Sequence, residues 1–597
     1  MVKLSDYLVQ FLARQGIKDV FMVSGGGIIH LTDSLGRNKN IKYICNYNEQ
    51  ATSYSAEGYA RFRNRISACL VTTGPGSTNA LSGVASAWMD SVPMLVISGQ
   101  VKRELIADYQ KLRQIGEQEV NIIDMVRPIT KYAATITNPK RIRYELERCF
   151  YEATSGRPGP VWLNIPLDVQ GSLIDPRSLP SFLPEKSGGK SSSGLKNKVK
   201  RTISLLKQSK RPVLFCGYGI RLAGAGNLLE QLLDKVKIPV LLSFNGMDLL
   251  SEDHPSLVGK PGIVGQRRAN FAVQNSDYFL SIGSRLNIKI VGYDYKNFAA
   301  RAKKIIVDID SQELKKSTVC PDLAVTADAG DFLKEFIRQA VKAGIRIDQK
   351  WLAACRQWKG RYPSISKDFL DNKKHVNTYV FYDRLSDVVK SQDVIISGNA
   401  LSALCLYQAF KVKKGQRVFT NNGYGAMGWD LPAAIGACIA NNRRPTICVT
   451  GDGSIQMNIQ ELQLVKHHRL PLKIFIFNNA GYTSIRLTQD NFFNGFYVGA
   501  DKASGVSNPD FKKIAESYGL NYEKILTNRQ LKSKIAKVIS RPGPVFCEVN
   551  VSPRQGLNPK TVSQRNPDGS FQSRPLEDMF PFLSREELEK NMQISKT

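Results

Sequence analysis

The chain has 597 residues, of which 42% are apolar and 23% charged, which is the composition of a globular protein and excludes a disordered one. Its length predicts several domains, it lacks a run of about 18 apolar residues that could span a membrane, and its ten cysteines form no CxxC pair typical of structural zinc. The net charge of +31 is spread along the sequence without a nucleic-acid-binding module, which argues against specific nucleic-acid binding and leaves anionic substrates or surfaces open.

The first predicted unit alternates helical and strand patterns. Met1 to Gly16 has the pattern of an amphipathic helix interrupted by charges, not that of a signal peptide, so we expect a cytoplasmic protein. Tyr43-Ile44-Cys45 is strand-like, and Glu49 follows it closely. Glycine-rich loops at 25–27 and 73–76 are weak signals when taken alone.

Two further units are predicted beyond residue 170. Residues 180–194 are rich in proline, glycine and serine, which is typical of a flexible linker. A second α/β unit at 190–345 opens with the apolar run 212–217, and a third occupies 370–550. Residues 551–597 form a polar, proline-rich tail that we hypothesise folds over the active site. The predicted fold is α/β, with three doubly wound parallel-sheet domains in series.

The third unit contains a strand-helix-strand pattern. Two apolar, β-branched runs, Thr446–Thr450 and Lys473–Phe477, are typical of buried strands. A helical spacing between them follows Ser454 and Asn458, two candidate N-caps. Because the ends of parallel strands meet at one edge of a sheet, we expect Asp452 and Asn479, which follow the two strands, to lie side by side.

This pair of residues predicts a magnesium-diphosphate site. Magnesium binds about six oxygens and takes only one or two carboxylates, so one aspartate, one asparagine amide oxygen and a backbone carbonyl suit it. Gly451 and Gly453 allow the backbone to approach phosphates, and the helix N-terminus after Ser454 favours their negative charge. Gly-Asp-Gly or Asn-Asn alone is more typical of a turn. Together, 27 residues apart, they indicate that Asp452 and Asn479 bind the metal.

The pair resembles the signature of thiamine diphosphate enzymes, and other segments resemble the acetolactate synthase branch of that family. These segments occur in family order along nearly the whole chain: Asn48-Glu49-Gln50, Ala56–Arg61, Thr73–Asn79, Gly99-Gln100-Val101, Gly156–Val161 and Leu431–Gly436. The resemblance implies a pyrimidine-binding domain at 1–170, a central domain at 190–345 and a diphosphate-binding domain at 370–550.

In this resemblance Glu49 matches the family's catalytic glutamate. That residue hydrogen-bonds the aminopyrimidine ring of thiamine diphosphate and promotes the tautomer that removes the C2 proton. The alternative for Glu49 is an ordinary acid at a helix N-terminus. Glu57 is interpreted as structural. The resemblance also implies a homodimer or homotetramer, in which Glu49 of one subunit completes the diphosphate site of another.

Further roles follow from the resemblance. Met427 matches the residue that props the cofactor into its bent form, although Met also fills core gaps. The carbonyl of Gly425 would accept from the pyrimidine amine, and the carbonyl of Gly481 would be the third protein ligand of magnesium. His30 is a candidate for proton transfer or for a structural role. The remaining expected cofactor contacts are Gly26, Gly27, Thr73, Asn79, Gly451, Gly453, Ser454 and Asn479.

Some positions depart from the family. Ala400-Leu401-Ser402 stands where acetolactate synthases carry Gly-Gln-His near the diphosphate, and Thr488 replaces the tryptophan that shapes the acceptor pocket. These departures argue against an enzyme of branched-chain amino acid synthesis and make Arg486 and Gln489 candidates for binding a carboxylate or a polar acceptor. Segments of the central domain resemble flavin-contacting segments, but Cys216–Ile220 lacks the full dinucleotide spacing, so FAD binding stays open.

The sequence therefore predicts a carboligase that depends on thiamine diphosphate and Mg²⁺. A 2-oxo acid such as pyruvate would lose carbon dioxide, and the two-carbon unit would pass to a carbonyl acceptor. The alternatives are a 2-oxo acid decarboxylase that releases an aldehyde and a non-catalytic regulatory homologue. The joint presence of Glu49, Asp452 and Asn479 argues against the last of these.

Overall fold

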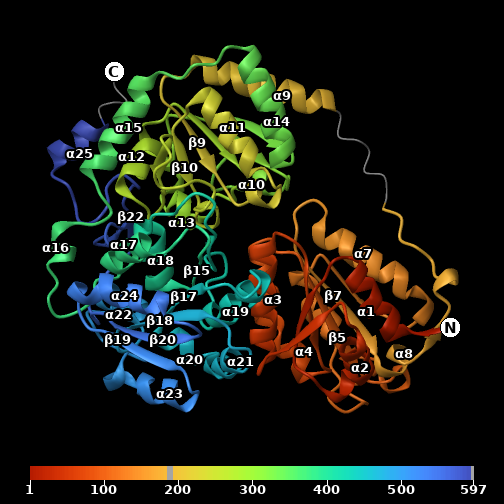
Figure 1. Cartoon of the computed structure of the whole chain (residues 1–597). Helices are drawn as coiled ribbons and strands as arrows, with labels where there is room; N and C mark the ends of the chain where they lie inside the picture. The colour runs from red at the N-terminus through yellow and green to blue at the C-terminus, as the bar shows by residue number, and fades with distance from the viewer. Residues whose placement is uncertain (185–191, 593–597) are drawn as a thin grey trace.

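The structure, a computed structural model, describes residues 1–184 and 192–592 and contains three six-stranded parallel sheets in series (Figure 1). The prediction of three doubly wound α/β domains is confirmed. Part of the predicted linker, residues 185–191, and the last five residues of the tail lie outside the described residues. The domain boundaries themselves stay a prediction.

The N-terminal sheet has the order β3-β2-β4-β5-β7-β6. Its inner strands are buried on both faces, as expected of a parallel sheet covered by helices on each side. The strands are β2 (Asp19–Met22), β3 (Lys42–Cys45), β4 (Ser67–Val71), β5 (Met94–Gln100), β6 (Tyr132–Thr135) and β7 (Pro160–Pro166). The main helices are α1 (Leu4–Arg14), α2 (Ile29–Arg37), α3 (Glu49–Arg63), α5 (Leu81–Met89) and α7 (Ile142–Thr154).

The C-terminal sheet has the order β16-β15-β17-β18-β20-β19. When the strands of each sheet are counted from its own first strand, both terminal sheets have the order 2-1-3-4-6-5. The strands are β15 (Val394–Ser397), β16 (Val418–Thr420), β17 (Thr446–Gly451), β18 (Leu472–Asn478), β19 (Asn521–Ile525) and β20 (Val545–Asn550). The main helices are α17 (Thr378–Val388), α18 (Ala400–Ala409), α19 (Asp430–Ala440), α20 (Asp452–Gln456), α21 (Leu462–His467), α22 (Thr483–Phe492), α23 (Phe511–Ser517) and α24 (Leu531–Ser540).

The central sheet, β11-β10-β9-β12-β13-β14, has the different order 3-2-1-4-5-6 of the dinucleotide-binding fold. Its chain order reverses between β9 and β12. The strands are β9 (Pro212–Cys216), β10 (Val240–Leu242), β11 (Leu257–Gly259), β12 (Tyr278–Ile282), β13 (Lys303–Asp308) and β14 (Leu323–Thr326). The main helices are α9 (Ser192–Gln208), α11 (Gly226–Val236), α12 (Arg267–Asn275), α14 (Ala329–Lys342) and α15 (Gln349–Arg361).

The two terminal domains meet through α3 and α19, which cross at close range between the two sheets (Figure 1). Each helix has a glycine at the crossing. A Cβ atom at Gly58 would collide with the backbone of Ala433, and one at Gly436 would collide with the carbonyl of Ser55. The absence of side chains at these two positions therefore sets the distance between the domains.

A buried charged network lies beside this crossing. Arg61 is 1% exposed and pairs with both Glu57 and Asp90. Glu57 also accepts hydrogen bonds from Ser86 Oγ (2.6 Å) and from Trp429 Nε1 of the C-terminal domain (2.8 Å). Burial raises the pKa of Glu57, and the neighbouring Arg61 lowers it. Glu57 thus joins the domains, in agreement with its expected structural role.

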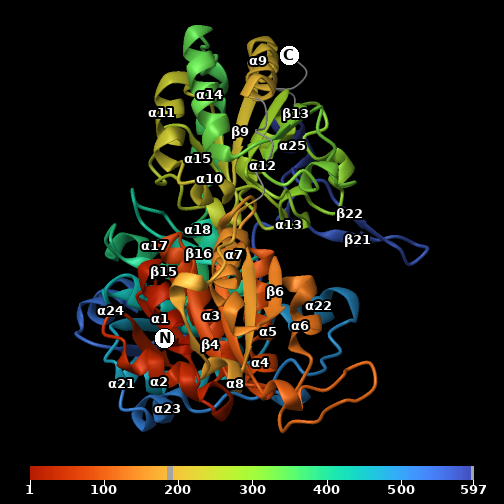
Figure 2. The same ribbon diagram turned by 90° about the vertical axis from the view of Figure 1, so that its right-hand side faces the viewer.

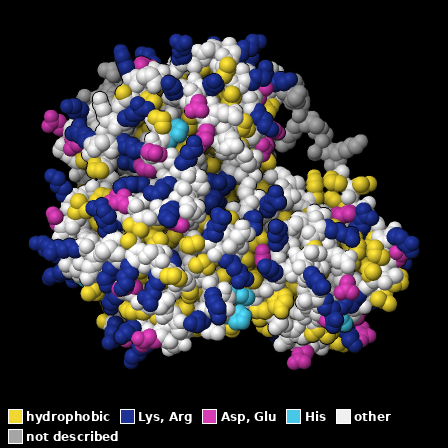
Figure 3. All heavy atoms as spheres, in the orientation of Figure 1, with side chains coloured by type: hydrophobic (Ala, Val, Ile, Leu, Met, Phe, Trp, Pro, Cys, Tyr) yellow, Lys and Arg dark blue, Asp and Glu magenta, His cyan; other side chains and the backbone are white. Residues whose placement is uncertain are grey.

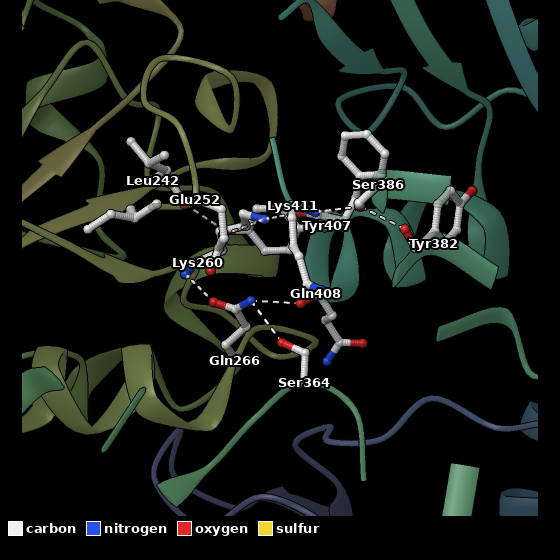
Figure 4. A network of polar contacts seen from close by, with 12 residues as sticks. Leu242, Glu252, Lys260, Gln266, Ser364, Tyr382, Ser386, Tyr407, Gln408 and Lys411 are labelled. Atoms are coloured by element: carbon white, nitrogen blue, oxygen red, sulfur yellow. Dashed lines mark hydrogen bonds and ion pairs between the residues drawn. The ribbon is translucent and has the colours of Figure 1, made fainter. Parts of the chain in front are cut away.

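The central and C-terminal domains are joined by a polar interface (Figure 4). The side chain of Lys260 is buried and donates to the carbonyl of Phe410 (3.0 Å), and burial lowers its pKa to about 8. Gln266 Nε2 donates to the carbonyl of Gln408 (2.6 Å), and the Tyr407 hydroxyl donates to the carbonyl of Leu242 (2.8 Å). Backbone carbonyls of α18 and of its C-terminal end are therefore fixed by central-domain side chains.

The tail packs mainly on the central domain. Arg267 donates to the carbonyl of Pro581 (2.6 Å), and Asn270 Nδ2 donates to that of Leu576 (2.9 Å). The tail ends in α25 (Arg585–Met592) and includes a hairpin, β21 (Ser563–Arg565) and β22 (Phe571–Ser573), which projects from the body (Figure 2). The Phe571 ring lies edge-on to Phe492 at the end of α22, with centroids 4.9 Å apart. The hairpin therefore lies beside the helix that follows the Asn-Asn motif.

Lys and Arg side chains are scattered among neutral and acidic ones on the face shown in Figure 3. None of the described helices combines the length and the apolar character needed to cross a membrane.

Candidate active site

Asp452 lies at the carboxyl end of β17, next to β18, which ends at Asn478. Its Oδ2 accepts hydrogen bonds from the backbone N–H of Asn479 (2.9 Å) and Gly481 (3.2 Å), and its Oδ1 accepts from Gly453 N–H (2.9 Å). The structure therefore brings together the three residues expected to bind the metal, although they are far apart in the sequence.

The environment of Asp452 fits a bound cation. The residue is 2% exposed, and burial raises the pKa of its carboxyl group while the surrounding N–H donors lower it. Within the described chain, Asp452 forms no salt bridge, and no three His, Cys, Asp or Glu residues gather into a metal cluster. A single buried carboxylate beside amide and carbonyl oxygens suits Mg²⁺, which takes most of its ligands from phosphate and water.

Arg486 stabilises the loop that carries the other two expected ligands. Its guanidinium donates to the carbonyls of Asn479 (2.8 Å), Ala480 (3.1 Å) and Ala500 (3.2 Å), and it is 5% exposed. The guanidinium is thus hydrogen-bonded to backbone carbonyls, and the structure does not support the expected role of Arg486 in binding a substrate carboxylate. Gln489 likewise bonds the backbone of Val498.

The segment after Asp452 differs in detail from the prediction. Asn458 stands at the N-cap position of the short 3-10 helix Ile459–Glu461, without a side-chain cap hydrogen bond, but α20 begins at Asp452 with Gly451 as N-cap, so Ser454 is not an N-cap. Instead, Ser454 Oγ donates to Asp430 Oδ2 (2.9 Å) and accepts from Gly428 N–H (2.8 Å). The prediction for Ser454 was wrong because a serine hydroxyl near the start of a helix can hydrogen-bond groups elsewhere in the fold as readily as the helix backbone.

The glycines and Met427 form one wall of this half of the site. A Cβ atom at Gly453 would collide with the ring of Tyr482 and lie 3.3 Å from Met427 Cε, whereas Gly451 faces open space. Gly425 has a φ of +76°, and its carbonyl accepts from Asn399 Nδ2 (3.0 Å). Met427 therefore reaches the Gly-Asp-Gly turn, where a wedge for the cofactor is expected.

The N-terminal half of the site gathers at the ends of β2, β3 and β4. Glu49 is the first residue of α3 and is 9% exposed, and its Oε2 accepts from Asn79 Nδ2 (3.1 Å). A Cβ atom at Gly76 would lie 3.1 Å from Glu49 Oε1, so this glycine leaves room for the carboxylate. Asn79 and Glu49 are thus neighbours, as the resemblance implies.

The glycine loop after β2 packs against the loop after β4. Gly27 N–H donates to Thr72 Oγ1 (3.2 Å), and Gly26 has open space beside it. Thr73 Oγ1 is buried without a hydrogen-bond partner, which marks a polar group available to a ligand. His30 lies against Gly171, so the structure gives no support to its role in proton transfer.

The two halves are connected through Asn458. Its Nδ2 donates to Gln50 Oε1 (3.0 Å), beside Glu49, and to the carbonyl of Gly428 (2.9 Å), beside Met427. Among the described residues, no hydrogen bond or ion pair joins Glu49 itself to the Asp452 group. Asn458 therefore links the two halves, while the hydrogen-bond partners of Glu49 and of Asp452 each come from the same domain as the acid itself.

Sequence reasoning missed two residues of the C-terminal half. Asn508 Nδ2 donates to Asp452 Oδ2 (2.7 Å) and to Asn478 Oδ1 (3.2 Å), and Asn399 bonds the Gly425 carbonyl. Asn508 stands in a loop 56 residues after Asp452 with no motif around it, so no local signal could have found it. Thr488 is exposed on α22, and Ala400 begins α18 with a φ of +47°.

A separate cavity lies at the carboxyl ends of the central strands. It is lined by Tyr218 after β9, Ser243 after β10, Ser284 after β12 and Asp308 at the end of β13, and it extends to Arg157 of the N-terminal domain. Burial raises the pKa of Asp308 to about 6. The cavity lies where the strand order of the central sheet reverses, which is the place where ligands bind in sheets of this type.

Two terminal domains with the same strand order each contribute half of the candidate site, and between them in the sequence lies a domain with the strand order of the dinucleotide-binding fold. Residues 2–125 match the N-terminal TPP binding domain of thiamine pyrophosphate enzymes, 199–336 the central domain and 399–549 the C-terminal TPP binding domain. The chain belongs to the thiamine pyrophosphate enzymes.

Within this family the chain is similar to acetolactate synthase large subunits along nearly its whole length. It is 33% identical to the subunit from Cyanidium caldarium, over 92% of this chain and 94% of that protein. It is 31% identical to the one from Haemophilus influenzae (97% and 100%) and 30% identical to the isozyme 1 large subunit from Escherichia coli (93% and 95%). The predicted family is confirmed, and the chain is a thiamine diphosphate-dependent carboligase of the acetolactate synthase type.

Proposed function

We propose that the protein decarboxylates a 2-oxo acid such as pyruvate and transfers the two-carbon unit to a carbonyl acceptor. Thiamine diphosphate, when bound, supplies the carbon nucleophile and the electron sink for this chemistry. The observation that carries the proposal is the buried Asp452 carboxylate, which lies beside Asn479 and Gly481 at the end of β17. Asp452, the Asn479 amide oxygen and the Gly481 carbonyl would hold Mg²⁺ against the diphosphate.

Glu49 would hold the proton at the aminopyrimidine ring. Its carboxylate is nearly buried and bonded to Asn79, which fixes its orientation without neutralising it. Positioned acid-base catalysis of this kind contributes about 10² to 10⁴ in rate. Burial at the start of α3 also excludes water from the reacting proton.

We propose a polar acceptor rather than a second small 2-oxo acid. Thr488 is exposed on α22 where the family has tryptophan, and this change makes the wall of the expected acceptor pocket smaller and more polar. The exposed edge of Phe571 on the tail hairpin lies by the end of the same helix. The space near α22 is therefore bounded by one polar and one aromatic surface.

The central cavity is proposed to bind the nucleotide part of FAD. Two polar atoms of residues that line it, Asn245 Oδ1 and Asn287 Oδ1, are buried without a hydrogen-bond partner in the described chain. Unsatisfied buried donors and acceptors favour a bound polar ligand. The visible absorption spectrum of the purified protein tests this proposal, because a bound flavin absorbs visible light and thiamine diphosphate does not.

The active site is proposed to form between two subunits of a homodimer or homotetramer. The two halves are complete on separate sheets, and large apolar side chains are exposed beside each of them. Tyr47 (54% exposed) lies next to Glu49, whereas Met457 (49%) packs by the Gly428 backbone. A contact between subunits would cover these two exposed side chains. A cytoplasmic location stays a prediction from the sequence.

Product analysis tests the reaction. The purified protein is incubated with thiamine diphosphate, Mg²⁺ and pyruvate, first alone and then with a set of aldehyde and ketone acceptors. We expect carbon dioxide release together with a ligated hydroxyketone. Release of free aldehyde alone under every condition would indicate a simple decarboxylase, and no cofactor-dependent carbon dioxide release from any 2-oxo acid would exclude both reactions.

A further inference from the structure

Glu461 of the C-terminal domain binds the turn that leads into Glu49. It ends a short 3-10 helix (Ile459–Glu461) and is completely buried. Its Oε1 accepts from the backbone N–H of Tyr47 (2.8 Å), and its Oε2 accepts from Asn46 Nδ2 (2.9 Å). The carboxylate of Glu461, in the C-terminal domain, therefore binds the N-terminal domain two and three residues before Glu49, the proposed catalytic acid.

The contacts of Glu461 are those of an anchor, not of an ion pair. The groups that act on it in the described chain are the neutral N–H donors of Asn46, Tyr47 and Asn48. Burial raises the pKa of its carboxyl group to about 7, while these donors lower it. A carboxyl group without a cationic partner is costly to bury, and its bonds to the turn offset part of that cost.

The turn has few other attachments. Asn46 N–H bonds the carbonyl of Met22 (2.9 Å), and Asn48 caps α3 through Gln50 N–H (2.7 Å). Tyr47 is 54% exposed and contributes no buried apolar anchor. Within the described residues, Glu461 thus provides the cross-domain hydrogen bonds to the turn between β3 and α3.

The opposite side of the interface repeats this arrangement. Glu461 follows the third strand of its sheet and faces the turn after the second strand of the N-terminal sheet. Asp90 likewise follows the third strand of its own sheet, and a Cβ atom at Gly423, after the second strand of the C-terminal sheet, would collide with its carboxylate. The two acids lie against equivalent turns of equivalent domains, although Asp90 pairs with Arg61 whereas Glu461 bonds its turn directly.

We propose that Glu461 is a positioning residue, which holds the 46–48 turn so that Glu49 is presented to the aminopyrimidine ring at a fixed place. The inference rests on the proposed function of Glu49. Glu461 does not touch the cofactor and acts through the backbone that precedes Glu49. Displacement of a catalytic group by about 1 Å can lower a rate 10²-fold, so an anchor at this distance in the chain is sufficient to affect catalysis.

The first test is Glu461→Gln, read against Glu516→Gln, an exposed carboxylate on α23 that serves as a matched control. The amide has nearly the same shape but places N–H groups against the N–H donors of Asn46 and Tyr47. In the protein without cofactor, hydrogen-deuterium exchange of the peptide containing residues 46–49 should become faster in E461Q and stay unchanged in E516Q. Unchanged protection of this peptide in E461Q would overturn the anchor.

The second test is a double-mutant cycle with Glu49→Gln. The rate of C2 proton exchange of bound thiamine diphosphate should fall about 10- to 100-fold in E461Q, with cofactor affinity within a few-fold of wild type. Because Glu461 acts through Glu49, E461Q should add no further loss in the E49Q background. Equal exchange rates in E461Q and wild type, or losses that add fully in the double variant, would overturn the proposal.

Two outcomes separate this inference from the proposed function. If E49Q itself exchanges the C2 proton at the wild-type rate, the role of Glu49 is wrong and the inference is overturned with it. If E461Q is too unstable to purify, Asn46→Ala replaces it, with Ser55→Ala as its control, since N46A removes the donor to Glu461 (2.9 Å) together with a hydrogen bond to Ser55 Oγ (3.2 Å). N46A should slow exchange less than E49Q does, and a wild-type rate in N46A would contradict the proposal.

Discussion

The N-terminal and C-terminal domains have the same strand order and cross through equivalent helices, yet they contribute different chemistry. In the N-terminal domain the proposed reactive group is an acid, Glu49, which follows the second strand. In the C-terminal domain the proposed ligands, Asp452 and Asn479, follow the third and fourth strands. The shared topology therefore supplies equivalent strand ends, and a few residues placed there decide which domain would bind the metal and which would hold the proton.

The two domains also differ in how their acids are compensated. The carboxylate of Asp452 receives four N–H donors, and Mg²⁺ would complete its neutralisation. Within the described chain, the carboxylate of Glu49 accepts one hydrogen bond, from Asn79. More hydrogen bonds therefore fix the position of the Asp452 carboxylate than fix that of Glu49.

The largest expected effect comes from Asp452→Asn, which removes the charge from the C-terminal half while keeping the shape. Mg²⁺-dependent binding of thiamine diphosphate should weaken at least about 100-fold, because the loss of a metal ligand costs at least as much as the loss of a supporting contact. Isothermal titration calorimetry measures this, with Asp331→Asn on the exposed face of α14 as the control. Wild-type affinity in D452N would contradict the assignment of the metal half.

Glu49→Gln tests the other half. We expect thiamine diphosphate affinity within a few-fold of wild type and a fall of about 10² to 10⁴ in kcat. Steady-state carbon dioxide release and calorimetry on the same preparation give both quantities. If E49Q lost binding and kept kcat at saturating cofactor, the division of labour between the domains would be the reverse of the one proposed.

The next effect concerns the crossing that relates the two domains. Gly58→Ala should destabilise the protein by about 1–3 kcal/mol, because the added Cβ atom collides with the Ala433 backbone. Gly36→Ala on the exposed face of α2 is the matched control, since nothing lies within 4 Å of its Cβ position, and it should be neutral or slightly stabilising. Thermal unfolding of the two variants measures the difference in stability. Equal Tm values for G58A and G36A would contradict a close-packed crossing of α3 and α19.

The smallest predicted effect is a pH dependence of stability at the domain interface. The folded-state pKa of Glu461, about 7, lies above its ordinary value of about 4.3, so the folded state holds the proton more tightly. Its contribution to stability is therefore fully present at low pH and is lost as the pH rises through about 7. The Tm of wild type minus that of E461Q should fall by about 1–4 °C between about pH 5 and pH 8.5. A difference that grows with pH would contradict the sign.

Much of the fold was predictable because its signals are local. The β-branched runs near Thr446 and Lys473 gave two buried strands, and the rule that parallel strand ends share an edge placed Asp452 beside Asn479. Asn508 and Glu461 were not predictable, because they reach the site through loops and through the other domain. The helix start at Asp452 and the backbone contacts of Arg486 also depend on tertiary partners that no local pattern encodes.

Complementation between E49Q and D452N tests most directly whether each active site is shared between two subunits. Each variant should be inactive alone, because each lacks one half of every site. If the halves of one site come from two subunits, mixed and reassociated dimers carry one intact site in each heterodimer, so activity should return to about one quarter of the wild-type value. No recovery of activity, with heterodimers shown to form, would contradict an active site shared between subunits.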